Sequence, residues 1–325
     1  MHPTYLDCAA QVVQARARIR NHIYQTPLIP SRSNDDRPNG TNVLFKAENF
    51  QLTGSFKIRG AMAKMSSASA SYDSSQRVIT ASSGNHGIGA ACAARALSRN
   101  LTVVLPETVV PAKLEKIRSY GVEVVLHGAE TGLAEQHAQE LAATGKYTYI
   151  SPYNDVDVIA GQGSIGLEIL EQATKVDNVF VAMGGGGLIS GIGAVCKAFS
   201  PDTKVYGVSA RNSMALAESM AAGRVVTTEH SPTLADAVAG GMDQDAVTLP
   251  LATAVVHEVI VCDEADIASA LKDMAFRENM LVEGAAALAL AGYNKVAERM
   301  NGQTNVIVLC GANYDQGVIA KTIYG

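Results

Sequence analysis

A lysine with apolar neighbours is the first group in the chain that could do chemistry. Lys57 lies between Phe56 and Ile58, where a helical pattern begins. An amine is a poor base or nucleophile while it is protonated near its ordinary pKa of about 10.4, so it needs a cofactor or an apolar pocket. Phe56 and Ile58 indicate such a pocket. Taken alone, the pattern also fits a surface lysine whose stem packs over apolar side chains.

A run of four glycines lies between a predicted strand over 179–183 and a predicted helix over 188–199. The run consists of Gly184, Gly185, Gly186 and Gly187. Its backbone N–H groups can point at one anion, and the helix dipole adds to the attraction, so a phosphate is the predicted ligand. A flexible turn is the alternative, at a high cost in chain entropy. The spacing lacks Gly-x-Gly-x-x-Gly, which favours a compact monophosphate over a dinucleotide.

A second polar turn, residues 82–87, also joins a predicted strand to a predicted helix. Its two hydroxyls, amide and imidazole belong to Ser82, Ser83, Asn85 and His86. Beside free N–H groups, such a loop can bind a carboxylate and place a hydroxyl over a reacting atom. The same residues could instead form a polar helix cap. Together with the glycine run and Lys57, they favour an amino-acid-binding loop.

The elements that must position these residues follow a regular pattern from Arg77 onward. Strands are predicted over 78–81, 101–105, 122–126, 147–151, 179–183, 204–209 and 306–310. Helices are predicted over 90–97, 112–120, 133–143, 158–173, 188–199, 213–223, 265–277 and 284–299. This alternation predicts an α/β fold with mostly parallel sheets that helices cover on both faces.

The chain before Arg77 is less regular. The predictions there are a helix over 8–23, a loop over 24–40, a strand over 43–49, and a helix from a Ser55 cap to Ala68.

A serine-rich stretch over 66–75 indicates a linker, and the region 223–250 has no clear pattern. We expect a small domain over 77–150 and a large, discontinuous domain over 1–76 and 151–325.

The composition excludes several classes of protein. With 325 residues, 47% of them hydrophobic, the chain can form two packed lobes. The net charge of -5 and the scattered Lys and Arg give no basis for a nucleic-acid partner. No apolar run reaches the roughly 20 residues that span a bilayer, and the start lacks the core of a secretion signal. Five separated cysteines argue against a zinc or disulfide framework, so a cytoplasmic protein with a small-molecule partner is expected.

Five motifs follow one another along almost the entire chain. They are Ser55–Ala61, Ser82–Gly87, Gly161–Gly163, Gly184–Leu188 and Cys310–Asp315. They resemble the fold type II pyridoxal-phosphate enzymes, in the branch that holds the serine/threonine dehydratases and serine racemases, including phenylserine and hydroxyectoine-utilisation dehydratases. The resemblance implies a tryptophan synthase β-like fold of two open, twisted, mostly parallel sheets, with pyridoxal 5'-phosphate as cofactor. It also implies a homodimer or a higher homo-oligomer.

The resemblance implies a role for each motif residue. Lys57 would form a Schiff base with the cofactor and then remove the α-proton, and Ser83 stands where racemases have their opposite-face acid. The residues expected to hold the cofactor are Lys57, Phe56, Asn85, Gly184, Gly185, Gly186, Gly187, Glu283 and Cys310. The substrate is expected to contact Ser82, Ser83, Asn85 and His86.

Cys310 stands at the position of the residue that contacts the ring nitrogen of the cofactor. A thiol is a weak hydrogen-bond partner and cannot stabilise a protonated pyridine as a carboxylate would, which favours prompt β-elimination over transamination. Without the resemblance, Cys310 would be interpreted as a small hydrophobic residue that closes a strand.

Three departures from the family pattern affect the expected ligands. Ser209 stands where relatives have a glutamate for a divalent ion, so we expect no metal. The stretch Ala235–Ala237 replaces the usual Ala-Asp-Gly near the substrate, and Tyr153 occupies a position that varies between branches. These departures leave the size of the substrate open.

The resemblance implies a dehydratase, an ammonia-lyase that converts L-β-hydroxy-α-amino acids into a 2-oxo acid and ammonia. Serine, threonine and larger 3-substituted serines such as phenylserine are all compatible substrates. The alternatives are a serine or other amino-acid racemase, because Ser83 is present, a nicotinamide oxidoreductase, and a phosphate-ligand binder without activity.

Overall fold

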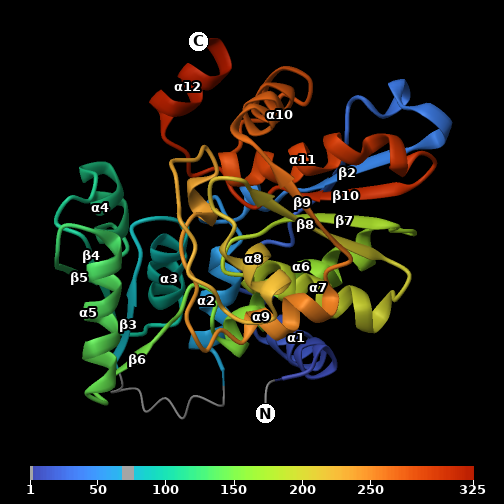
Figure 1. Cartoon of the computed structure of the whole chain (residues 1–325). Coiled ribbons are helices and arrows are strands. Elements are labelled where there is room, and N and C mark those ends of the chain that lie inside the picture. Colours follow the sequence, from blue (N-terminus) through green and yellow to red (C-terminus); the bar gives the residue numbers. More distant parts are fainter. Residues whose placement is uncertain (1–2, 68–76) are drawn as a thin grey trace.

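The computed structural model describes residues 3–67 and 77–325 and holds two sheets, which lie side by side in Figure 1. The larger sheet has the strand order β1 (Leu28–Pro30), β2 (Asn42–Lys46), β10 (Thr304–Val308), β7 (Asn178–Ala182), β8 (Lys204–Ala210) and β9 (Glu258–Cys262). Its strands pair in parallel except for β1, which runs antiparallel to β2. The predicted α/β class with mostly parallel sheets is confirmed.

The smaller sheet is parallel throughout. Its strand order is β5 (Glu123–Leu126), β4 (Leu101–Leu105), β3 (Arg77–Ala81) and β6 (Tyr147–Tyr149). Helix α5 (Thr131–Ala143) covers one face. On the other side, α3 (Asn85–Ala96) lies between this sheet and the larger part of the molecule, and α4 (Pro111–Arg118) packs against α3.

Helices cover both faces of the larger sheet, as Figure 1 shows. On one face lie α11 (Gly284–Val296) and α10 (Glu264–Phe276), with α12 (Gln316–Tyr324) beside α10. On the other lie α7 (Gly187–Phe199), α6 (Val156–Gln172), α1 (Tyr5–Ile19), α2 (Lys57–Met65), α8 (Ala215–Ala222) and α9 (Thr248–Val255). Short 3-10 helices are η1 (Asn34–Asp36), η2 (Pro38–Gly40), η3 (Glu48–Phe50), η4 (Asp236–Val238) and η5 (Ala297–Met300).

Local sequence signals explain where several helices begin. Asp155 caps α6 through its side chain, and Asp263 forms a reciprocal capping box with Asp266 at the start of α10. Pro111 occupies the first turn of α4, where its missing N–H costs nothing. Helix α11 is buried almost all round, which matches its run of alanine and leucine against the larger sheet.

The loops that carry the candidate chemistry meet between the two sheets. Strands β3, β7 and β10 each lead at their carboxyl ends into one of the motif loops. Helix α2 is tied to the loop after β10, because the N–H of Phe56 donates to the carbonyl of Cys310 at 3.1 Å and Ser55 forms an isolated bridge with Gly311. Lys57, which begins α2, is thereby fixed next to Cys310.

Three predictions before Arg77 need correction. Ser55 does not cap α2: the helix begins at Lys57 after Phe56, and the buried Ser55 hydroxyl has no hydrogen-bond partner among the described residues. The predicted loop over 24–40 contains β1 and two 3-10 helices. The predicted strand over 43–49 ends at Lys46, and α2 ends at Met65. Most of the predicted serine-rich linker lies outside the described residues.

Three further elements, after Arg77, were not predicted from the sequence. They are α9, β9 and α12. Helix α9 falls at the end of the ambiguous region, and its proline at the third position weakens the helical pattern. Within the described residues, no helix combines the length and apolar character needed to cross a membrane.

Candidate active site

Lys57 begins α2 with its side chain half-buried. Its Nζ donates to the carbonyl oxygen of Pro152 at 2.9 Å and lies 5.3 Å from the centre of the Phe56 ring. Burial lowers the pKa of the Lys57 amine from 10.5 to about 8, although the nearby Cys310 and Glu283 oppose the shift. A useful fraction of this amine is therefore neutral near physiological pH.

A cavity opens at Lys57 and brings together segments that are far apart in the sequence. All the residues predicted to hold the cofactor line it: Phe56, Lys57, Asn85, Gly184, Gly185, Gly186, Gly187, Glu283 and Cys310. Further lining residues are Pro152, Tyr153, Ala182, Leu188, Ile189, Ala237, Val238 and Ala285. The substrate-loop residues Ser82, Ser83 and His86 are not among its lining.

The glycine run forms one wall of the cavity, between β7 and α7. Gly186 has a φ of +92°, a left-handed conformation that favours glycine. A Cβ at Gly185 would lie 2.4 Å from Cγ of Tyr153, and one at Gly184 would lie 3.0 Å from the Cα of Val238. These positions therefore exclude side chains. Because α7 starts at Gly187, free N–H groups and the helix dipole favour an anion here.

The carboxylate of Glu283, surrounded by amides, also lines the cavity. Asn85 donates through Nδ2 to both Glu283 oxygens, at 2.9 and 3.0 Å, and the backbone N–H of Asn313 donates at 3.1 Å. Burial raises the pKa of Glu283, and these donors counteract the shift. The Asn313 side chain also donates to Oδ1 of Asn85 at 2.7 Å. The predicted bond from Asn85 to the cofactor thus competes with its bond to Glu283.

The Cys310 thiol lies beside this carboxylate, with Sγ 3.7 Å from Oε1 of Glu283. Burial and the nearby Glu283 raise the pKa of the thiol well above its usual value. Cys310 is therefore an uncharged thiol. The predicted preference for β-elimination depends on such a thiol at the ring nitrogen.

The polar turn over residues 82–87 places its side chains in two different environments. Ser82 and Ser83 are half-buried, and Oγ of Ser82 accepts from the N–H of Gly84 at 3.2 Å. His86 is buried against the smaller sheet, with Nε2 3.0 Å from Oγ1 of Thr80 and 3.2 Å from the carbonyl of Ile150. Burial lowers the pKa of His86 to about 3, so its ring is neutral. These contacts favour a role for its ring in holding the loop.

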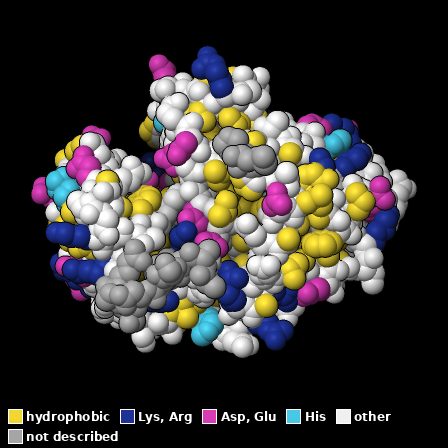
Figure 2. Space-filling model, turned by 90° about the horizontal axis from the view of Figure 1, so that it is seen from below, with side chains coloured by type: hydrophobic (Ala, Val, Ile, Leu, Met, Phe, Trp, Pro, Cys, Tyr) yellow, Lys and Arg dark blue, Asp and Glu magenta, His cyan; other side chains and the backbone are white. Residues whose placement is uncertain are grey.

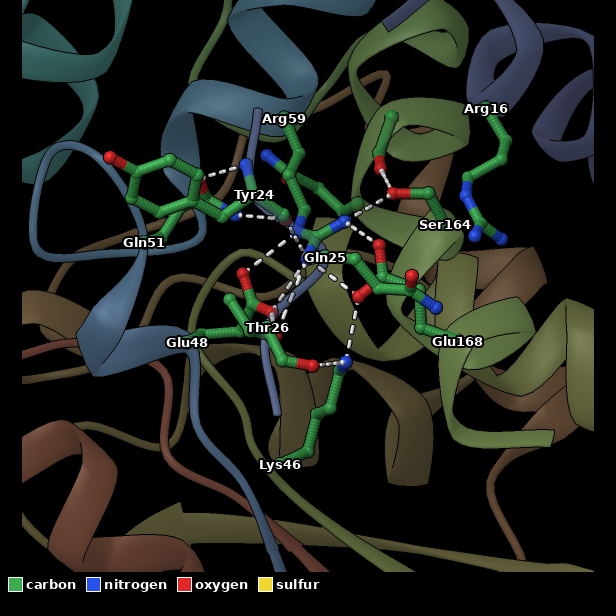
Figure 3. A network of polar contacts seen from close by, with 12 residues as sticks. Arg16, Tyr24, Gln25, Thr26, Lys46, Glu48, Gln51, Arg59, Ser164 and Glu168 are labelled. Carbon is green, nitrogen blue, oxygen red and sulfur yellow. Dashed lines mark hydrogen bonds and ion pairs between the residues drawn. The ribbon is translucent and has the colours of Figure 1, made fainter. Parts of the chain in front are cut away.

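A buried network of charges surrounds Arg59, as Figure 3 shows. Arg59, two residues after Lys57, contacts the Glu48 carboxylate at 2.8 Å through Nε and NH2. It contacts the Glu168 carboxylate at 2.7 and 2.9 Å. Lys46 Nζ lies 2.7 Å from Glu168. Two cations and two carboxylates therefore balance, and they tie α2 to β2, η3 and α6.

Three groups that contact the site residues were not predicted from the sequence. Asn313 lies inside the Cys310–Asp315 motif but received no role. The carbonyl of Pro152 is a backbone atom and leaves no sequence signal. Thr248 donates to the carbonyl of Gly185 at 2.7 Å and supports the glycine run from α9, an element that was not predicted.

The chain is similar to known proteins over nearly its whole length. The model of the pyridoxal-phosphate dependent enzyme family matches residues 19–311. The chain belongs to this family. A catabolic L-threonine dehydratase of Staphylococcus aureus is 36% identical over 318 residues, which cover 97% of this chain and 91% of that protein. This pyridoxal-phosphate enzyme therefore falls in the fold type II branch of serine/threonine dehydratases.

Solved structures agree with this assignment. Threonine deaminase isoform 2 from Solanum lycopersicum superposes with a TM-score of 0.91 and 30% identity, covering 100% of this chain and 96% of that one. Maize serine racemase gives a TM-score of 0.87 and 30% identity, covering 97% and 96%. The branch therefore includes both of the reaction types expected from the sequence.

Pyridoxal 5'-phosphate is the cofactor of this enzyme, and the cavity fits it. The glycine run leaves no room for side chains and offers N–H groups to a phosphate. The amine of Lys57, with its lowered pKa, lies in the same cavity as the Cys310 thiol and the Asn85 amide. Among the residues that the structure describes, no cluster of three or more His, Cys, Asp or Glu could hold a metal ion.

Proposed function

We propose that this pyridoxal-phosphate enzyme is a dehydratase that converts L-β-hydroxy-α-amino acids into a 2-oxo acid and ammonia. The observation that carries the proposal is the uncharged Cys310 thiol, which lines the same cavity as the Lys57 amine. A thiol does not stabilise a positive ring nitrogen, which disfavours a long-lived carbanion and favours the rapid loss of a β-hydroxyl.

Lys57 is the proposed catalytic base. When bound, pyridoxal 5'-phosphate supplies an electron sink for the bonds at the substrate Cα. Lys57 would hold the cofactor covalently through Nζ, and its released amine would accept the α-proton of the substrate. The β-hydroxyl then leaves with a proton as water. The resulting enamine takes up water and yields the 2-oxo acid and ammonia.

The other predicted contacts keep their proposed roles. The glycine run would bind the phosphate, Phe56 would support the ring, and Asn85 would donate to the 3'-oxygen. Glu283 would lie at the ring edge and Cys310 at the ring nitrogen. Ser82, Ser83 and His86 belong to the loop proposed for the substrate carboxylate.

Racemisation is the second candidate, because Ser83 is present at the position of the opposite-face acid of racemases and maize serine racemase is similar in structure. In deuterated water, a racemase would exchange the α-hydrogen and invert the substrate without releasing ammonia. The dehydratase proposal predicts that 2-oxo acid formation exceeds inversion. Fast inversion without ammonia would contradict it.

A panel of β-hydroxy amino acids scored for 2-oxo acid tests the proposal directly. Lys57→Ala should lower turnover at least about a hundredfold, the range of a lost general base. Lys113→Ala, which removes an exposed lysine of α4, is the control and should keep full activity. Turnover that survives Lys57→Ala would reject the assigned base.

We also propose the domain division 1–76 and 151–325 against 77–150, since every strand of the smaller sheet falls between Arg77 and Tyr149.

A homodimer or higher homo-oligomer is proposed as well. Figure 2 shows a broad group of hydrophobic side chains on the half of the lower face away from the smaller sheet. Exposed Leu6 and Val13 belong to α1, on that side of the molecule. Light scattering at several concentrations tests the assembly.

A cytoplasmic location is proposed because all five cysteines are free thiols. Fractionation of the source cells would test it, and recovery outside the cytoplasmic fraction would contradict it.

A further inference from the structure

A second, outer cavity continues from the candidate active site toward the smaller sheet. It shares six lining residues with the inner cavity: Lys57, Pro152, Tyr153, Gly185, Ala237 and Val238. Its remaining lining is Glu135 of α5 and the segment Ala239 to Asp243. Because Lys57 lines both cavities, the outer cavity adjoins the place where a substrate would meet this amine. We call it the outer chamber.

Tyr153 forms the wall between the glycine run and the outer chamber. Its ring lies against Gly185, and its hydroxyl accepts from the N–H of Asp243 at 2.7 Å. Asn154 ties the same segment down, since its Nδ2 donates to Asp243 at 3.0 Å and its Oδ1 accepts from the N–H of Val247. Hydrogen bonds therefore hold the segment around Asp243 against Tyr153 and Asn154.

The outer chamber has room for a large substituent. Gly240 and Gly241 line it without side chains, and a Cβ on either one would meet no atom within 4 Å. Tyr153 and Gly185 line the same space. A methyl group, as in threonine, would leave it largely unfilled.

Apart from Lys57, the charged residues that line the outer chamber are acidic. Its charged lining residues are Lys57, which the cofactor occupies, and two carboxyl groups, those of Glu135 and Asp243. Glu135 accepts from the Tyr149 hydroxyl at 3.0 Å, and burial together with the charge of Asp243 raises the pKa of Glu135. An anionic substituent would face like charge or require proton uptake. A neutral substituent with N–H or O–H groups would find two acceptors.

On these observations we infer that the outer chamber selects β-hydroxy amino acids with a bulky, uncharged, hydrogen-bond-donating β-substituent and rejects those with a second carboxylate. The inference rests on the proposed function, because it names the substrate class of the same site. Glu135 and Asp243 are the residues that determine this specificity.

A pair of substrates of equal size isolates the charge. 3-Hydroxyasparagine and 3-hydroxyaspartate of the same configuration differ only in amide against carboxylate. We expect kcat/KM for the amide to exceed that for the acid by on the order of tenfold or more, the size of a like-charge interaction across several ångströms at a protein surface. Equal values, or a preference for the acid, would overturn the inference, and this comparison needs no variant.

The double substitution Glu135→Gln and Asp243→Asn assigns the effect to these two residues. It should reduce the preference for the amide to within about threefold, mainly by raising kcat/KM for the acid. Glu140→Gln, on the exposed side of the same helix, is the control and should leave the preference unchanged. An unchanged preference in the double variant would overturn the assignment.

A separate measurement distinguishes this inference from the proposed function. If no amino acid releases ammonia although the cofactor is bound, the proposed dehydratase function fails. The two substrates can then be titrated against the absorption spectrum of the cofactor-loaded protein. Tighter binding of the amide would support the inferred selectivity, and equal or tighter binding of the acid would overturn it.

Discussion

Replacement of Arg59 by methionine should be far more destabilising than the same replacement of Arg16, whose carboxylate partner is exposed. The Arg59 side chain is fully buried and makes four contacts of 2.7 to 2.9 Å with two carboxylates, those of Glu48 and Glu168. Without it, Lys46 alone would face both buried carboxylates. Removing one partner from a buried charge pair costs about 3–5 kcal/mol, a large share of the roughly 5–15 kcal/mol that stabilise a domain.

The matched control is the same substitution at Arg16, a half-buried arginine whose carboxylate partner is exposed. Arg16 makes a two-point contact with Glu171 at 2.9 and 3.0 Å, but the Glu171 side chain is 53% exposed. Exposed pairs contribute roughly 0.2–1 kcal/mol, so Arg16→Met should have a small effect. Arg59→Lys, which retains the charge but loses the forked geometry, should fall between the two.

The assay is urea unfolding of the three variants and the wild type, analysed with a common slope. The expected order of destabilisation is Arg59→Met, then Arg59→Lys, then Arg16→Met. The electrostatic reasoning would be refuted if Arg59→Met and Arg16→Met shifted the midpoint equally. If Arg59→Met does not fold, the comparison of Arg59→Lys with Arg16→Met still decides the outcome.

Four further predictions concern the candidate site. Gly185→Ala should weaken cofactor binding at least about tenfold, because the added Cβ would collide with the Tyr153 ring. In the control Gly132→Ala the added Cβ meets no atom, so the affinity for the cofactor should not change. Equal affinities of the two variants would contradict the close contact between Gly185 and Tyr153. Ser83→Ala should keep ammonia release within about threefold while reducing any substrate inversion about a hundredfold; parallel losses would contradict the separate role. The rate at which cofactor-free protein captures the cofactor should rise with pH around a midpoint of about 8, because the neutral Lys57 amine is the nucleophile; a midpoint near 10.5 would contradict the lowered pKa. Since that pKa is lowered by folding, cofactor-free stability should also rise from about pH 8 to 10.5.

The strand-to-helix turns were the part of the site most accessible from sequence. Gly184 to Gly187 follow a fully buried strand, and both their composition and their place predicted an anion site. Lys57 was identified from its apolar neighbours together with the family motifs. These signals are local, so a single stretch of sequence carries them.

The contacts that orient these residues could not be predicted in the same way. Arg59, Glu48 and Glu168 lie on three separate elements, and their pairing depends on how those elements pack. Ser55 looked like a helix cap, but the bridge to Gly311 places it in an extended segment before the helix. Packing between distant segments therefore pairs Arg59 with its carboxylates and overrides the local capping signal of Ser55.

Reduction with borohydride followed by peptide mass mapping tests the central claim, that the amine of Lys57 carries the cofactor. The account predicts that the reduced pyridoxyl group is found on the peptide that contains Lys57 and that Lys57→Ala protein remains unlabelled. A label on another lysine, or no label on protein loaded with the cofactor, would contradict it.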